Sequence, residues 1–124
     1  MPDAEEVLEH EQVGGVHVLR LRLSRIEDVS ALLLFENALS EILETEEGAG
    51  PRVIVNLGSL DYMVTTALAV LMSFRTKLMA AGGRLRLCCP RPDVAEVFRI
   101  THFDEFFEIS PTEREALRDM GRGR

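Results

Sequence analysis

The stretch from residue 53 to residue 71 constrains this chain most, because its hydrophobic period changes from that of a strand to that of a helix. Val53-Ile54-Val55 is a continuous apolar run, which is typical of a strand buried on both faces. The helical period begins at Thr65-Thr66, where a hydroxyl pair stands at the expected helix start. Two interpretations follow: the threonines only cap the helix, or they are sites of modification.

Strand and helix patterns alternate along the rest of the chain. Strands are predicted at 7–12, 16–23, 53–57, 84–89 and 106–109, and helices at 29–47, 65–81, 93–100 and 111–120. The strand at 16–23 reads as half-buried, and residues 24–28 read as a polar connection. Strands separated by helices favour parallel pairing with helices over the sheet. The prediction is an α/β fold with a central mixed, mostly parallel sheet of about five strands and about four helices.

Length and composition limit the function classes. The 124 residues suit one domain, expected at 14–120, after an acidic leader or edge strand at 1–13 and before a basic frayed tail at 121–124. The formal charge of −7 argues against nucleic acid as a partner. The apolar runs are much shorter than the roughly 18–20 residues of a membrane span, so we expect a cytoplasmic protein without one.

The histidines and cysteines form no recognisable catalytic motif in the sequence. His10, His17 and His102 lie in three separate segments, so neither a metal site nor a nucleophile triad has local support. Cys88 and Cys89 are adjacent, and on a strand their side chains would point to opposite faces. We therefore read them as small buried hydrophobes. The prediction is that the protein is not an enzyme and uses no metal or cofactor.

The predicted helix at 65–81 has two distinct faces. Its core stripe is expected to hold six apolar residues: Ala67, Val70, Leu71, Phe74, Leu78 and Ala81. The opposite face carries no charge, and consists of Thr65, Ala69, Met72, Thr76 and Met79 with Leu68 at its margin. A solvated helix face usually carries charged residues, so this stripe indicates a docking partner, unless the tail or the loop at Pro90 covers it.

Several motifs together resemble the STAS domain (sulfate transporter and anti-sigma factor antagonist) of anti-sigma factor antagonists, over residues 14–118. The most specific part is Val53-Ile54-Val55-Asn56-Leu57 followed by Val64-Thr65-Thr66-Ala67-Leu68. It is similar to the family's strand ending in Asp-Leu and its Asp-Ser-Ser-Gly-Leu motif. Downstream, the runs at 81–85, 94–98 and 106–109 also follow the family's pattern.

This resemblance implies a phosphorylated acceptor at Thr65, with Thr66 as the second hydroxyl. The chain departs from the family at three positions: Asn56 and Val64 stand where acids are usual, and Ala67 replaces a glycine. The predicted partner-binding residues are Asn56, Asp61, Val64, Leu68, Ala69, Met72, Thr76 and Met79.

Two functions remain open at this stage. In the first, the chain is a regulatory module that engages an anti-sigma factor or serine/threonine kinase and is switched by phosphate on Thr65. In the second, it is an unphosphorylated structural subunit of a stressosome-type assembly or of a lipid transporter. The second would use the same helix face permanently, in a homo-oligomer or a larger STAS assembly.

Overall fold

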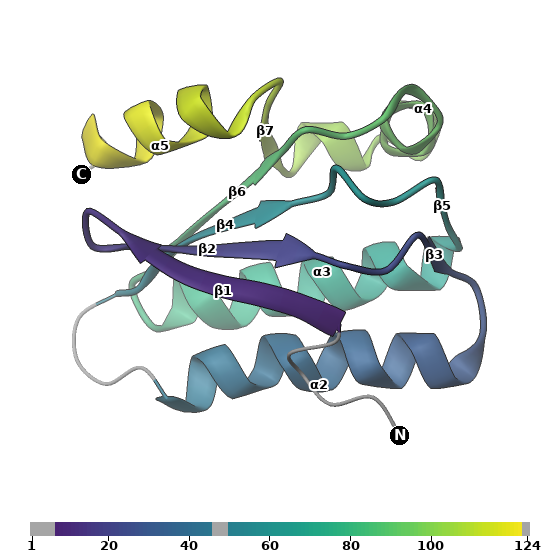
Figure 1. Ribbon diagram of the computed structural model, residues 1–124, viewed down its shortest axis with the longest axis horizontal. Coiled ribbons are helices and arrows are strands. Elements are labelled where there is room, and N and C mark those ends of the chain that lie inside the picture. The colour runs from purple at the N-terminus through teal and green to yellow at the C-terminus, as the bar shows by residue number, and fades with distance from the viewer. Residues whose placement is uncertain (1–6, 46–49, 123–124) are drawn as a thin grey trace.

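A five-stranded sheet forms the centre of the molecule (Figure 1). The computed structural model describes residues 7–45 and 50–122 and orders the strands β1-β2-β4-β6-β7. Their bounds are β1 (Leu8–Val13), β2 (Val16–Leu21), β4 (Arg52–Asn56), β6 (Arg84–Cys88) and β7 (Glu108–Ser110). The pair β1–β2 is antiparallel, whereas every other neighbouring pair is parallel. The predicted mixed, mostly parallel sheet is confirmed.

Four α-helices surround this sheet within the described residues. Figure 1 shows α2 (Val29–Thr45) and α3 (Thr65–Ala80) on one face and α5 (Glu113–Arg122) on the other. The fourth helix, α4 (Pro92–Ile100), lies near the C-terminal ends of the parallel strands. None of the helices within 7–45 and 50–122 combines the length and the apolar character that crossing a bilayer requires.

The apolar run of β4 lies at the middle of the sheet, as predicted. Val53, Ile54 and Val55 are all fully buried. Val53 and Val55 belong to the main core beneath α2 and α3, while Ile54 packs with Ala116 and Met120 of α5. Two helical layers therefore bury the alternating side chains of one strand on both of its faces.

The prediction that β2 is half-buried is wrong. Except for the partly exposed Arg20, its residues are all buried, including His17 at 3% exposure. The sequence pattern mixes arginines with leucines, which suggests one solvated face. However, α5 packs over that face and covers Val16, so the strand is shielded on both sides.

Two short strands were missed by the sequence analysis. β3 (Arg25–Ile26) lies in the segment read as a polar connection, and β5 (Tyr62–Met63) lies directly before α3. They pair in parallel as a separate small sheet. A pair of two-residue strands has no detectable period, so only its partner across the fold reveals it.

The helix ends differ from prediction in detail. α5 begins at Glu113 rather than at residue 111, and Thr112 caps it, because the Glu115 N–H donates to Thr112 Oγ1 at 3.1 Å. α4 begins at Pro92 rather than at residue 93, and no side chain caps it. Residues 121 and 122 of the expected tail continue α5. The leader at 1–6, the predicted helix end at 46–47 and residues 123–124 lie outside the described residues.

The turn between α3 and β6 requires glycine at position 83. A Cβ added to Gly83 would lie 2.4 Å from the carbonyl oxygen of Pro51, which already accepts the Arg84 N–H at 3.0 Å. The contact is with backbone that is held in place, so it cannot relax cheaply.

We predict that Gly83→Ala lowers the free energy of unfolding by about 1–3 kcal/mol, because the added methyl group overpacks this turn. Urea unfolding followed by circular dichroism measures the change. Gly121→Ala is the matched control, since nothing lies within 4 Å of its added Cβ and alanine favours α5. Equal stability of Gly83→Ala and the unmodified chain would contradict the close approach.

Candidate functional site

The predicted hydroxyl pair lies at the C-terminal edge of the parallel strands, where α3 begins (Figure 1). After β4, a short turn brings Leu57 and Leu60 into the core, with the Leu60 N–H bonded to the Leu57 carbonyl at 3.0 Å. The Val64 N–H then donates to the carbonyl of Ile26 at 2.9 Å. The start of α3 is thus fixed by backbone hydrogen bonds to the small β3–β5 sheet.

Both threonines are exposed in the first turn of α3. The N-cap residue is Val64, in an extended conformation with φ −76° and ψ 158°, and no side chain caps the helix. The interpretation that the threonines serve only as caps is therefore wrong, because they lie inside the helix. Their hydroxyls stand at the end where unpaired N–H groups and the helix dipole favour an anion.

The outer face of α3 is largely as predicted. Ala69, Thr76 and Met79 are exposed, Met79 at 52%, and Met72 is half-buried. We call Thr65, Ala69, Met72, Thr76 and Met79 the outer face of α3. The Thr76 hydroxyl donates to the Met72 carbonyl at 3.0 Å, so this polar group is satisfied within the helix.

Leu68 is a correction to the predicted partner-binding set. Its side chain is fully buried in the main core, together with Ala67 and Leu71, so it cannot reach a partner in this structure. Ala81, predicted as the end of the core stripe, is exposed. The core-facing side of α3 is therefore shifted toward Leu68, because α2 as well as the sheet packs against this helix.

Asp61 takes part in a clasp between two loops. Its carboxylate forms an ion pair with Arg91 at 3.1 Å, and the Arg91 Nε–H donates to the carbonyl of Gly58 at 2.8 Å. Both charged side chains are more than half exposed. The clasp joins the β4–β5 loop to the start of α4 at the edge that holds Thr65.

The Asn56 side chain forms hydrogen bonds within the fold. Its Nδ2–H donates to Glu113 Oε1 at 2.9 Å, and its Oδ1 accepts the Gly58 N–H at 2.8 Å. Arg20 donates to both oxygens of Glu113, at 2.9 and 2.8 Å. Asn56 therefore points toward α5, on the opposite side of the sheet from α3, and is held apart from the outer face of α3.

Arg20 and Glu113 shift each other's ionisation. The Arg20 guanidinium lowers the pKa of Glu113, and the hydrogen bond to Glu113 raises the pKa of Arg20. Because the folded-state pKa of Glu113 lies below its ordinary value, the pair stabilises the fold above that value. This contribution is lost as the pH falls through the lower folded-state pKa. Neither residue was predicted for the site, because Arg20 lies in a strand expected to be half-buried and Glu113 lies near the start of the helix predicted at 111–120.

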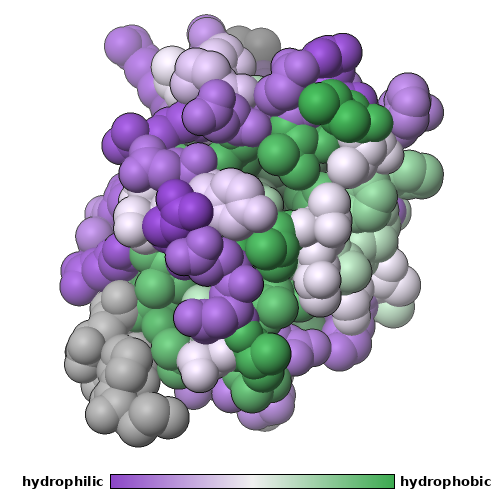
Figure 2. All heavy atoms as spheres, turned by 90° about the vertical axis from the view of Figure 1, so that its right-hand side faces the viewer, coloured by the Kyte–Doolittle hydropathy of each residue, from purple (hydrophilic) through white to green (hydrophobic). Residues whose placement is uncertain are grey.

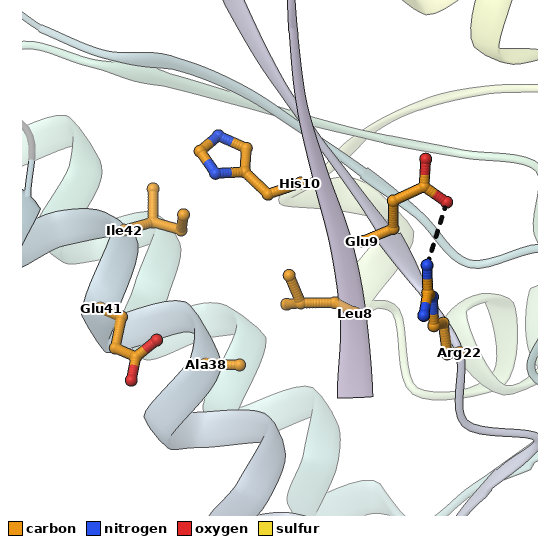
Figure 3. A pocket seen from close by; sticks show the side chains of 7 residues that line it. All are labelled: Leu8, Glu9, His10, Arg22, Ala38, Glu41 and Ile42. Atoms are coloured by element: carbon orange, nitrogen blue, oxygen red, sulfur yellow. Dashed lines mark ion pairs between the residues drawn. The ribbon is translucent and has the colours of Figure 1, made fainter. Parts of the chain in front are cut away.

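A separate hollow of about 460 Å³ lies between β1 and α2. Figure 3 shows Leu8 of β1 facing Ala38 and Ile42 of α2, with the ion pair between Glu9 and Arg22 (3.6 Å) beside the strand. None of the residues predicted for the site lines this hollow. Within residues 7–45 and 50–122, no group of three or more His, Cys, Asp and Glu side chains could hold a metal ion.

Known proteins with similar sequences belong to one domain family. The sequence model of the STAS domain family matches residues 4–116. BtrV of Bordetella bronchiseptica, named as a candidate anti-sigma factor antagonist, is 32% identical over 100 residues, which cover 74% of this chain and 86% of BtrV.

Solved structures show the same fold. The unphosphorylated form of the anti-sigma factor antagonist SpoIIAA of Bacillus has a TM-score of 0.73 at 24% identity, covering 94% of this chain and 97% of that one. Its phosphorylated form has a TM-score of 0.65 at 22% identity, with coverages of 90% and 96%. The murine anion transporter Slc26a9 has a TM-score of 0.73 at 11% identity, covering 91% of this chain and 19% of the transporter. At these identities the likeness concerns the fold alone.

The asparagine at the end of β4 is explained by Glu113. An aspartate there could not donate to Glu113 and would place a second carboxylate against it. We predict that Asn56→Asp lowers the free energy of unfolding at pH 7 by about 1–3 kcal/mol. The loss should shrink in acid, as one carboxyl becomes protonated.

Chemical denaturation of a double-mutant cycle measures this effect. In the Glu113→Gln background the repulsion is absent, so Asn56→Asp should cost far less there. An equal cost in both backgrounds would show that Asn56 and Glu113 do not interact as described.

Proposed function

The chain belongs to the STAS domain family, and from that membership we propose that it is a regulatory protein-binding module of the anti-sigma factor antagonist type. Its partner in this proposal is an anti-sigma factor with serine/threonine kinase activity, in the cytoplasm. The partner docks on the outer face of α3 and transfers a phosphate to Thr65. The protein itself catalyses no reaction.

The observation that carries this proposal is the exposure of Thr65 in the first turn of α3, outside the cap position. A phosphate there would lie at the positive end of the helix dipole, so the free domain tolerates it. The same phosphate adds about −1.5 to −2 charges to the outer face of α3, none of whose residues is charged. Phosphorylation thus changes binding without unfolding the domain.

The surface beside Thr65 suits a partner that buries it. Figure 2 looks onto the end of the molecule where α3 begins, and shows green and white atoms next to one another across part of this face. Exposed Met79 and half-buried Met72 continue the apolar character along α3. Methionine side chains adapt their shape to a partner, and a partner surface that fits them would lose that fit once a phosphate is added.

We predict that the cognate kinase phosphorylates the unmodified chain and Thr66→Ala, but not Thr65→Ala, as measured by mass spectrometry. The partner that docks on the unphosphorylated protein should bind Thr65→Asp at least about tenfold more weakly than Thr65→Ala, because the aspartate places a negative charge in an apolar contact. Calorimetric titration measures both affinities, and Thr66→Asp is the neighbouring control. Equal affinities for Thr65→Ala and Thr65→Asp would contradict the switch.

A second candidate is a permanent subunit of a larger assembly or transporter. Val64 in place of the acid that precedes the acceptor, and Ala67 in place of glycine, favour it. The similar fold of a domain within the Slc26a9 transporter also supports it at the level of architecture.

Size-exclusion chromatography of the native protein from cell extract separates the two functions. An antagonist should leave its complex once Thr65 is phosphorylated, because the added charge opposes docking. A permanent subunit should elute in the same large complex before and after phosphatase treatment. The phosphatase-treated and kinase-treated samples control for each other.

A further inference from the structure

The two cysteines are brought together by an unusual backbone conformation. Cys88 is the last residue of β6, and Cys89 follows it with φ 64°, in the left-handed region that favours glycine. In this conformation the Cys89 side chain does not point to the opposite face from Cys88, as it would in a regular strand. The Sγ atoms lie 3.2 Å apart and both thiols are free, so the expectation of opposite-facing side chains is wrong.

Backbone hydrogen bonds hold the pair on both sides. The Cys88 carbonyl accepts the Leu57 N–H at 2.9 Å, and the Cys89 N–H donates to the Ser110 carbonyl at 3.0 Å. These bonds tie the two residues to the β4–β5 loop and to the end of β7. The fold therefore keeps the sulfur atoms in contact, which raises their effective concentration toward each other.

The two sulfur atoms have different surroundings. Cys88 is fully buried in the cluster with Ile54, Ala116 and Met120. Burial, and then the contact with Cys89, raises the pKa of the Cys88 thiol. Cys89 is half-buried and reachable from solvent. Because the thiolate is the nucleophile, an oxidant should react first at Cys89 and leave Cys88 as the second, resolving thiol.

We propose that Cys88 and Cys89 are a redox modification site, at which a peroxide converts the two thiols into a disulfide between adjacent residues. The Cys89 thiol first releases its proton to solvent, and the thiolate attacks hydrogen peroxide. An S–O bond forms, the O–O bond breaks, and the departing hydroxide takes up a proton from solvent and leaves as water. The Cys88 sulfur then attacks the sulfenic acid, an S–S bond forms, the S–O bond breaks, and the Cys88 proton leaves with the second water. The thiols lose two electrons and the peroxide gains them.

The position of the pair connects it to the candidate site. A Cβ at Gly58 would lie 3.6 Å from the Cβ of Cys89, and Gly58 accepts the hydrogen bond from Arg91. Closing the disulfide changes the backbone beneath the loop that Arg91 and Asp61 clasp. Oxidation of the two thiols does not require phosphorylation at Thr65.

The test is a hydrogen peroxide titration of the folded full chain. After each dose the chain is unfolded, its remaining thiols are alkylated with N-ethylmaleimide, and its intact mass is measured. We expect a monomer that loses about 2 Da, carries no maleimide and recovers two adducts after dithiothreitol. The peptide containing Cys88 and Cys89 should carry the mass loss. In urea the same product should form several-fold more slowly, because the fold no longer holds the thiols together.

Two variants control for the single thiols. Cys88→Ala should give sulfenic or sulfinic acid at Cys89 without the loss of mass, and Cys89→Ser should keep Cys88 open to maleimide. Circular dichroism shows whether each variant is folded, and the result on the unmodified chain stands without them. The proposal is overturned if both thiols stay alkylatable, if sulfinic acid at Cys89 is the main product, or if linked dimers form instead.

Discussion

The two-sided burial of β4 is the constraint on which the rest of the structure depends. Val53, Ile54 and Val55 leave no exposed apolar surface only if one helical layer covers each face of the sheet. Parallel strands on both sides of β4 then end at the same edge. The loop that leaves β4 and the start of α3 must lie at that edge, where open α/β sheets commonly place their functional residues.

The helical layer formed by α5 explains why polar side chains form hydrogen bonds beside the otherwise apolar sheet. α5 covers the strands from the side opposite α3. Its first residue, Glu113, accepts hydrogen bonds from Arg20 of β2 and from Asn56 of β4. Charged groups in a half-buried place are tolerated when hydrogen bonds satisfy them. Asn56 thus belongs to the support of the sheet edge, while the outer face of α3 presents Thr65. The motif from Asn56 to Thr65 therefore contributes to both sides of the sheet, since Asn56 faces α5 and Thr65 begins α3.

The same edge also gathers the pair of cysteines and the clasp of Asp61 with Arg91. Gly58 joins these features, since it accepts from Arg91, donates to Asn56 and lies against Cys89. The thiol pair lies against the β4–β5 loop at Gly58, whereas Thr65 begins α3 at the same edge of the sheet. The likeness to anti-sigma factor antagonists concerns this architecture and does not by itself assign either chemistry.

The sequence alone determined the fold class, the central place of β4 and the start of α3, because hydrophobic period and turn residues are local properties of the chain. It also placed Thr65 in the first turn of α3 and predicted that Ala69, Thr76 and Met79 face away from the core. Only the tertiary structure decided which partners the polar residues have: that α5 shields β2, that Leu68 faces the core, and that Asn56 donates to Glu113. The contact between Cys88 and Cys89 depends on one left-handed residue, which the alternation of a strand cannot reveal. Contacts between segments distant in sequence leave no period, so they appear only when the layers are assembled.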